Sequence, residues 1–339
     1  MSHHNTDVVI IGAGPVGLFA IFQAGMLGMT CHIVDNLPHI GGQCSALYPE
    51  KPIYDIPAFP QISGQNLIDN LEKQADPFNP HYHLSQQVTE VIKNNDGSFL
   101  VKTSLETEIT AKIIIIAAGA GAFGPNRPPL SNIMQFENHS VFYSVRHIEN
   151  FKDKNIVIAG GGDSAVDWAL ALQPIAHSIS VVHRRDKFRA APDNVEKLRL
   201  LAKAGKINWC VPGQLHGLKG EGTALQNVLI KNDTGDIQPL KADILLPFYG
   251  LAAKLGPIAD WGLNLDRTHI ATEQATSQTN IKGIYAVGDI ATYPHKLKLI
   301  LTGFSEVASA LHHAYNIVFE GKSLHFEYST SKGVHTAHT

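Results

Sequence analysis

The chain has few cysteines, and their spacing excludes several kinds of site. Among its 339 residues only Cys31, Cys44 and Cys210 are cysteines, and no two of them form a C-x-x-C pair. This pattern excludes a disulfide framework and argues against a structural zinc site, so we expect no bound metal. No run of about 18 apolar residues is present, and the opening MSHHNTD lacks an apolar targeting segment. We therefore expect a cytoplasmic protein without a membrane partner.

The charge balance gives no reason to expect nucleic acid as a partner. The formal net charge is -3 and the isoelectric point is near 6.6, whereas general nucleic-acid binding requires a basic surface. The length suits about two domains, each large enough to bury a core of its own.

The first motif is a glycine turn near the N-terminus. An apolar run, Val8–Ile11, predicts a buried parallel strand, and Gly12, Gly14 and Gly17 follow it in the spacing G-x-G-x-x-G. Glycines permit the tight turn, let the backbone approach a pyrophosphate and let the following helix pack closely, while the helix N-terminus attracts phosphate. Asp35 ends a second strand-like run, 23 positions after Gly12, where an acid binds a ribose hydroxyl.

The same pattern occurs again later in the chain. An apolar run, Ile156–Ala159, precedes the sequence GGGDSA, in which Gly160, Gly162 and Ala165 repeat the pattern. The distance that led to Asp35 now leads to His183, which opens the segment HRRDKFRA. The cationic residues that follow are Arg184, Arg185, Lys187 and Arg189. An acid favours a free ribose 2'-hydroxyl and arginines suit a 2'-phosphate, so we predict FAD or NAD at the first site and NADP at the second.

The remaining segments predict how these two units are connected. Segment 36–57 is rich in turn formers and is expected to be a long functional loop. Ser63 is expected to cap a short helix, alternating residues over 86–110 predict an antiparallel meander, and 302–317 predicts a long helix. Two Gly-rich crossovers flank the second unit.

We predict the α/β fold class, with two Rossmann-like dinucleotide-binding domains, the second inserted in the first. The expected boundaries are 1–118 and 249–325 for the first domain, which binds FAD or NAD, 119–248 for the inserted NADP domain and 326–339 for a C-terminal tail.

The order of the motifs resembles that of the two-dinucleotide flavoprotein reductases, and in particular the thioredoxin-reductase group. The shared segments are GAGPVG, IIIIAAG, GGGDSA, HRRDKFRA and GIYAVGDI. The redox-active C-x-x-C of that group falls on positions 143–146, which read YSVR. In the related glutathione-reductase group the pair follows the first nucleotide loop, where Cys44 is present but Pro49 stands five residues later. Neither dithiol exists, so electrons cannot leave a flavin through an internal disulfide.

What remains is similar to the ferredoxin–NADP reductases of the thioredoxin-reductase-like type. The similarity lies in segment 41–55 (GGQCSALYPEKPIYD), segment 296–304 (KLKLILTGF) and a tail that contains YST. The resemblance implies FAD and NADPH as cofactors, hydride transfer to flavin N5, and single-electron release to ferredoxin or flavodoxin. It also suggests a homodimer.

The resemblance further implies roles for individual residues. Tyr48 and Tyr328 are expected to stack on the two flavin faces, the tyrosine at 328 from the tail that covers the flavin. Asp289 is expected to bind the ribityl chain, and Thr330 to offer a hydroxyl. The expected FAD-binding residues are Gly12, Gly14, Pro15, Gly17, Asp35, Gly42, Gln43, Tyr48, Val88, Phe123, Asp289 and Thr330. The expected NADPH-binding residues are Gly160, Gly162, Asp163, Ser164, Ala165, His183, Arg184, Arg185 and Arg189.

Some alternatives stay open at this point. Cys44 is expected to be a small residue in a tight loop rather than a catalytic thiol, and Lys296 and Lys298 are candidates for a basic face toward ferredoxin. A less specific NADPH diaphorase with another acceptor would share these motifs. A protein that senses FAD and NADPH without turnover would share them too.

Overall fold

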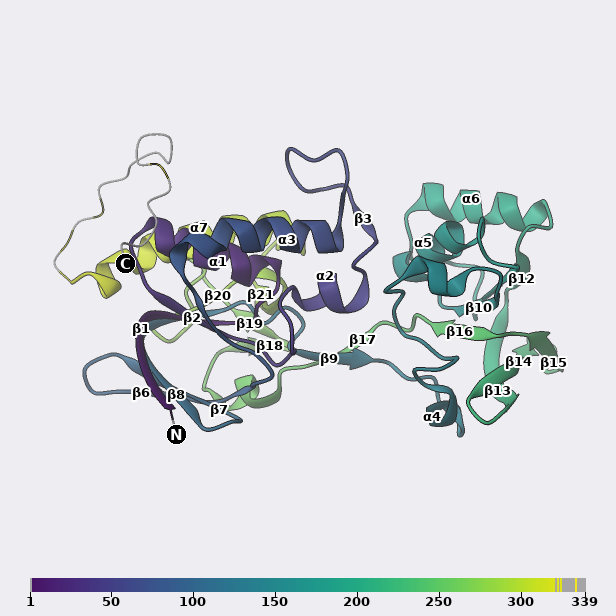
Figure 1. Ribbon diagram of the computed structural model, residues 1–339, viewed down its shortest axis with the longest axis horizontal. Helices are drawn as coiled ribbons and strands as arrows, with labels where there is room; N and C mark the ends of the chain where they lie inside the picture. The colour runs from purple at the N-terminus through teal and green to yellow at the C-terminus, as the bar shows by residue number, and fades with distance from the viewer. Residues whose placement is uncertain (1, 321, 323, 325–332, 334–339) are drawn as a thin grey trace. The chain divides into compact units, whose positions relative to one another are not determined.

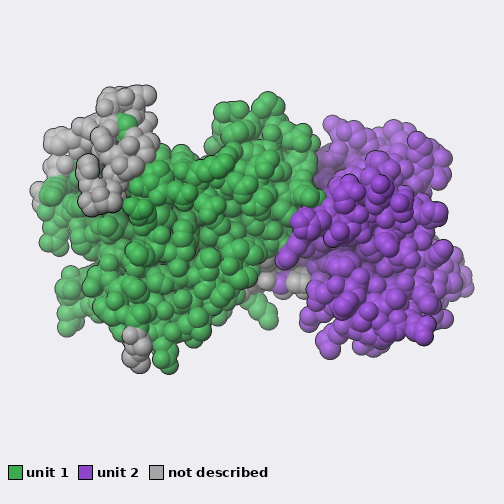
Figure 2. Space-filling view, in the orientation of Figure 1, with its two compact units in different colours: residues 1–123, 253–339 green, residues 124–252 purple. Residues whose placement is uncertain are grey.

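The computed structural model describes residues 2–320, 322, 324 and 333. The chain divides into two compact units, coloured separately in Figure 2. Unit 1 comprises residues 1–123 and 253–339, and unit 2 comprises residues 124–252. The boundaries expected from the sequence, 119 and 248, fall a few residues before those of the units.

Unit 1 contains the larger sheet of the described chain (Figure 1). The strands of unit 1, in this sheet and in two smaller ones, are β1 (Ser2–Ile11), β2 (Cys31–Val34), β3 (Pro52–Ile53), β4 (Ile62–Ser63), β5 (His81–His83), β6 (Val88–Lys93), β7 (Phe99–Thr103), β8 (Thr107–Ile116), β18 (Leu265–Asp266), β19 (His269–Ala271), β20 (Ile284–Ala286) and β21 (Ala291–Thr292). Its helices are α1 (Pro15–Met26), α2 (Gly42–Leu47), α3 (Gly64–Ala75) and α7 (Ile300–Val318), with 3-10 turns η1 (Asp76–Phe78), η3 (Gly256–Asp260) and η4 (Gly288–Ile290).

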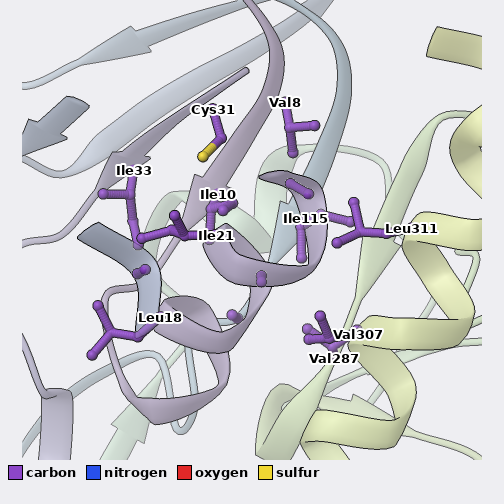
Figure 3. Close-up of a cluster of buried hydrophobic side chains, with 14 of the residues drawn as sticks. Val8, Ile10, Leu18, Ile21, Cys31, Ile33, Ile115, Val287, Val307 and Leu311 are labelled. Atoms are coloured by element: carbon purple, nitrogen blue, oxygen red, sulfur yellow. The ribbon is translucent and has the colours of Figure 1, made fainter. Parts of the chain in front are cut away.

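The sheet of unit 1 is built around β1, which pairs in parallel with β2 and β8. The strand order is β5-β2-β1-β8-β7-β6, and β20 adds a further parallel partner to β8. Val8 and Ile10 of β1 pack with α1, α3 and α7 on one face, as Figure 3 shows in part. Val9 and Ile11 pack into a second apolar cluster. A strand segment buried on both faces reads as an unbroken apolar run, as Val8–Ile11 does.

Three local predictions for unit 1 are confirmed. The Ser63 hydroxyl accepts a hydrogen bond from Asn66 N at 3.2 Å and caps α3. Strands β6, β7 and β8 form the antiparallel meander. The long helix α7 covers the predicted range and extends it by one or two residues at each end.

Two features of unit 1 differ from the prediction. Strand β1 begins at Ser2, because Ser2–Thr6 pair with Thr107–Ala111 of β8. The segment expected to be an irregular loop contains helix α2, which begins after Gly41 in the left-handed region at φ 106°.

Unit 2 contains a four-stranded parallel sheet and a three-stranded antiparallel sheet. Its strands are β10 (Asn155–Ala159), β11 (Ser178–Val182), β12 (Asn208–Cys210), β13 (Gly213–Glu221), β14 (Ala224–Asn232), β15 (Ile237–Lys241) and β16 (Ile244–Pro247). Its helices are α4 (Ile133–Phe136), α5 (Asp163–Leu172) and α6 (Pro192–Lys203), with the 3-10 turn η2 (Ile148–Phe151). Strands β9 (Ala122–Pro125) and β17 (Leu251–Lys254) pair with each other where the chain crosses the unit boundaries.

The parallel sheet of unit 2 has the order β12-β11-β10-β16. The chain leaves β10 through α5 toward β11, while β16 lies on the other side of β10. The strand order therefore reverses at β10. In open parallel sheets ligands bind at the carboxyl ends of the strands, at such a reversal.

Candidate functional site

A large pocket opens in unit 1 where β1, β2 and β8 end. It encloses about 1250 Å³, part of it open to solvent, and backbone and side chains of several chain segments line it. Its lining runs from the glycine turn after β1 to Asp289, which suits an extended ligand such as a dinucleotide. Of the expected FAD residues, those that line it are Gly12, Gly14, Pro15, Asp35, Gly42, Gln43, Tyr48, Val88 and Asp289.

The turn between β1 and α1 requires glycine for two separate reasons. Gly12 has φ 110°, and a Cβ there would lie 2.4 Å from the carbonyl oxygen of Ala117. Gly17 does not line the pocket, but a Cβ there would lie 1.8 Å from the carbonyl oxygen of Gly12. The glycine at 17 therefore sets the distance between α1 and the turn. No acidic residue occupies the first turn of α1, so its N-terminus stays favourable for an anion.

Asp35 is held in place by backbone donors at the end of β2. Its Oδ2 accepts a hydrogen bond from Ala13 N at 2.6 Å, and its Oδ1 accepts one from Leu37 N at 2.8 Å. Burial raises the pKa of this carboxyl, although the two hydrogen bonds act in the opposite direction. Asp35 N also donates to the carbonyl oxygen of His83 on the neighbouring strand β5, at 3.1 Å. The carboxylate is thus fixed at the pocket edge before any ligand binds.

Helix α2 carries the next group of pocket residues. It brings Gln43 and, at its C-terminal end, the half-buried Tyr48 to the pocket wall. Burial raises the pKa of the Tyr48 hydroxyl, which lies 3.7 Å from the Cys44 thiol. Cys44 is 1% exposed, and burial raises its pKa to about 11. A thiol that stays protonated at neutral pH is a poor nucleophile, which agrees with a packing role for Cys44.

The turn η4 forms another part of the pocket wall, with Gly288 and Asp289 facing it. Behind this turn lies Glu306 of α7, a buried carboxylate that accepts a hydrogen bond from Gly288 N at 2.7 Å. Sequence reasoning missed Glu306, although it falls on the buried stripe of α7 between Gly303 and Ala310.

The basic face suggested for ferredoxin must be corrected at one position. The Lys296 side chain is only 5% exposed and forms an ion pair with Glu306. It therefore cannot present a charge to a partner protein. Lys298 is exposed, with its Nζ 2.7 Å from His269 Nε2.

The second glycine turn, in unit 2, lies between β10 and α5. Gly160 has φ 151°, and a Cβ there would lie 2.5 Å from the carbonyl oxygen of Phe248. Gly162 is the N-cap of α5, Asp163 and Ser164 are exposed in its first turn, and Ala165 is buried beneath them. The expected residues are thus gathered at the carboxyl end of the parallel sheet.

The loop after β11 is attached to this turn at three points. Arg189 N donates to the carbonyl oxygen of Gly161 at 2.7 Å, and Ala191 N donates to the Asp163 carboxylate at 3.0 Å. The His183 ring packs against Gly161 so closely that a Cβ there would lie 2.3 Å from Nε2. The loop therefore presents its arginines beside the glycine turn.

The side chains of Arg184, Arg185 and Arg189 are exposed on this loop. Burial lowers the pKa of His183, and these three arginines lower it further, so the imidazole is neutral at pH 7. Apart from Lys187, the loop's cationic charge therefore comes from guanidinium groups, which suit bidentate contacts to phosphate.

Three expected residues cannot be placed. Tyr328 and Thr330 lie outside the described residues, and the side chain of Phe123 in β9 is not described either. Within residues 2–320, 322, 324 and 333, no group of three or more His, Cys, Asp or Glu side chains could hold a metal ion. No helix in the same part of the chain is long and apolar enough to cross a bilayer.

Comparison with known protein families matches residues 6–315 to the pyridine nucleotide-disulphide oxidoreductases. The chain belongs to this family. A curated relative, the ferredoxin–NADP reductase of Rickettsia felis, is 60% identical over 329 residues, which cover 97% of this chain and 98% of the relative. The family resemblance found in the sequence is confirmed.

Solved structures of related enzymes confirm the predicted α/β fold class. The thioredoxin reductase of Lactococcus lactis (FR conformation) matches with a TM-score of 0.78 and 27% identity, covering 93% of this chain and 99% of that one. The thioredoxin reductase of T. acidophilum matches with a TM-score of 0.79 and 22% identity, covering 94% and 100%, and supports the fold alone. Although the family name refers to disulphide, all three cysteines of this member are free.

Proposed function

We propose that the protein transfers electrons between NADPH and ferredoxin, with FAD as its bound cofactor. The observation that carries this proposal is a contrast between the two glycine turns: the first is hydrogen-bonded to the fixed acid Asp35, and the second lies beside an arginine loop. A full-length relative at 60% identity is named ferredoxin–NADP reductase, which supports the same activity.

In unit 1, FAD would lie in the large pocket. The α1 N-terminus would receive its diphosphate, Asp35 a ribose hydroxyl and Asp289 the ribityl chain, with Tyr48 against the ring system. The residues present fit this group, because the turn excludes side chains where the backbone must approach the diphosphate, while Asp35 is already fixed by two backbone donors.

In unit 2, NADPH would lie across the carboxyl end of the parallel sheet. The α5 N-terminus and the glycine turn would receive the diphosphate, and Arg184 and Arg185 the 2'-phosphate. Because His183 stands after β11 where Asp35 stands after β2, NADPH is favoured over NADH.

The reaction needs no acid, base or nucleophile from the chain. Bound FAD supplies the chemistry, since a flavin accepts a hydride from NADPH and releases electrons singly. The protein's part is to hold both nucleotides, and it offers the electrons no internal dithiol. Free, widely spaced cysteines suit a one-electron protein acceptor rather than a disulfide substrate.

An anaerobic experiment tests the proposal. NADPH is added to the FAD-loaded protein, flavin absorbance is followed, and ferredoxin is then supplied, with flavodoxin, thioredoxin and a disulfide dye in parallel. We expect rapid bleaching followed by ferredoxin reduction. Bleaching without transfer to ferredoxin would move the function to a diaphorase with another acceptor. No bleaching would move it to a nucleotide-sensing protein.

The remaining expectations are parts of the same proposal. Flavodoxin as an alternative acceptor and a homodimer follow from the resemblance, and a cytoplasmic location stays the expectation drawn from the sequence. Size-exclusion chromatography with light scattering tests the oligomeric state.

A further inference from the structure

Glu306 is an acidic residue in an apolar environment, in the N-terminal half of α7. The residue is 6% exposed and falls among Val307, Ala310 and Leu311, which belong to the core of unit 1. Burial of a carboxylate is costly unless the group is paired and hydrogen-bonded. Its retention at this position therefore requires an explanation beyond packing.

Three groups satisfy the Glu306 carboxylate. Gly288 N donates to Oε2 at 2.7 Å, Tyr293 OH donates to Oε1 at 2.6 Å, and Lys296 Nζ forms an ion pair with Oε1. The Lys296 Nζ also lies 5.1 Å from the centre of the Tyr293 ring. One carboxylate thus joins the turn η4 to the segment that follows it.

The backbone at Gly288 is confined from two sides. Gly303 of α7 approaches so closely that a Cβ there would lie 2.5 Å from Val16 Cγ2 and 3.3 Å from Gly288 Cα. Gly288 itself has φ 73°, in the region that favours glycine. The helices α1 and α7 therefore fix where this turn lies, while Glu306 fixes how its amide is oriented.

The pocket residues on this wall are the neighbours of that network. Val16, Gly288 and Asp289 line the pocket, and so do Leu299 and Ile300 at the start of α7. A rotation of the Gly288 amide would redirect the adjoining Asp289 side chain. Glu306 therefore acts on the cofactor pocket through one residue, Gly288, to which it is hydrogen-bonded.

We infer that Glu306 is a positioning residue for FAD, which holds the Gly288 amide so that Asp289 faces the pocket in the orientation that the cofactor needs. Lys296 neutralises the buried charge and fastens the Tyr293–Lys296 segment to the same carboxylate. The inference rests on the proposed function, because it presupposes FAD in the pocket of unit 1.

Two double variants separate positioning from stability. Glu306→Gln/Lys296→Met removes both charges but keeps a carbonyl oxygen for Gly288 N. Glu306→Leu/Lys296→Met removes both charges and this acceptor, and apolar replacement of a buried ion pair is often neutral for stability. Glu320→Gln, an exposed position just after α7, is the matched control.

The dissociation constant of FAD is measured by recovery of flavin fluorescence, and thermal unfolding is measured on the apoproteins. We expect the Gln/Met variant to bind FAD within about threefold of the wild type. The Leu/Met variant should unfold at a similar temperature and bind FAD at least about tenfold more weakly. NADPH affinity, a property of unit 2, should stay unchanged in both.

Equal FAD affinity in the two double variants would overturn the inference and leave Glu306 a structural residue. A wild-type protein that binds no FAD would overturn the proposed function, and the inference with it. If the Leu/Met variant does not fold, FAD affinity is measured on Glu306→Asp instead. It keeps the charge for Lys296 but withdraws the carboxylate from Gly288 N, so unchanged FAD affinity in that variant would also overturn the inference.

Discussion

Four histidines gather at the edge of the unit 1 sheet and predict a loss of stability in acid. His4 of β1 has its ring centre 5.2 Å from those of His32 and His83, and His32 lies 5.1 Å from His83 and 4.7 Å from His81. His32 Nδ1 lies 2.9 Å from His83 Nε2, so the two rings share one proton in a hydrogen bond. Protonation of both rings would place two donors against each other.

The direction of the effect follows from the pKa of His32. Burial lowers that pKa from 6.5 to about 4, and His83, His81 and His4 add to the shift. In the folded state the ring stays neutral at pH values where the unfolded chain already binds a proton. Stability therefore decreases as the pH falls from 6.5 toward 4. The full loss is about 3 kcal/mol, and about 2 kcal/mol of it is reached at pH 5.

The substitution His32→Phe isolates this contribution, because it keeps a ring but removes the titration. His216→Phe, at an exposed position on β13, is the control. The free energy of unfolding is measured in urea at pH 7.5 and pH 5. We expect the wild type and the control to lose about 2 kcal/mol more than the His32 variant over this interval. Equal losses in all three proteins would refute the reasoning.

The acid effect should also reach the cofactor pocket, because the His83 carbonyl oxygen accepts the hydrogen bond from Asp35 N. Release of FAD below pH 6 should therefore be slower in His32→Phe than in the wild type.

Three variants test the glycine turns and the arginine loop. Replacing Arg184 and Arg185 together with alanine removes two charge-assisted contacts of roughly 1.5–3 kcal/mol each, so KM for NADPH should rise about 100-fold or more while KM for NADH is spared; equal losses would contradict the assignment. Gly17→Ala should destabilise unit 1 by about 1–3 kcal/mol in thermal unfolding, since its Cβ would lie 1.8 Å from a backbone oxygen. Asp163→Ala removes the bond to the loop backbone and should raise KM for NADPH about fivefold without changing FAD affinity; an unchanged KM would mean that the loop needs no such attachment.

The sequence was most informative where one residue type is required by local geometry. At positions 12 and 160 the backbone has a positive φ and lies close to another backbone segment, so glycine is the residue that fits. The two turns could therefore be predicted from the sequence. Asp35 could be predicted for a related reason, because the end of the second strand follows the glycine turn at a nearly constant sequence spacing.

Short elements that depend on tertiary contacts could not be predicted from the sequence. Helix α2 has six residues, too few to be stable alone, and it lies against Gly64 of α3, where a Cβ would meet the carbonyl oxygens of Tyr48 and Cys44. Likewise, Ser2–Thr6 are polar and show no strand periodicity. They are extended because β8 offers an unpaired edge beside them.

Glu306 shows why the composition of a helix face can mislead. The buried stripe of α7 is apolar except at this position. In the sequence alone, an isolated glutamate on such a stripe suggests that the buried face of the helix has been assigned wrongly. Neither of its partners Gly288 and Lys296 can be recognised from the sequence. Gly288 contributes a backbone amide, a group that nearly every residue has, and Lys296 precedes the helix in a segment whose composition is typical of a surface. A buried acid of this kind becomes interpretable only when the turn that it supports is seen to line a pocket. A charge on an otherwise apolar helix face is therefore best treated as a pointer to the neighbouring site, to be tested by ligand affinity rather than by stability alone.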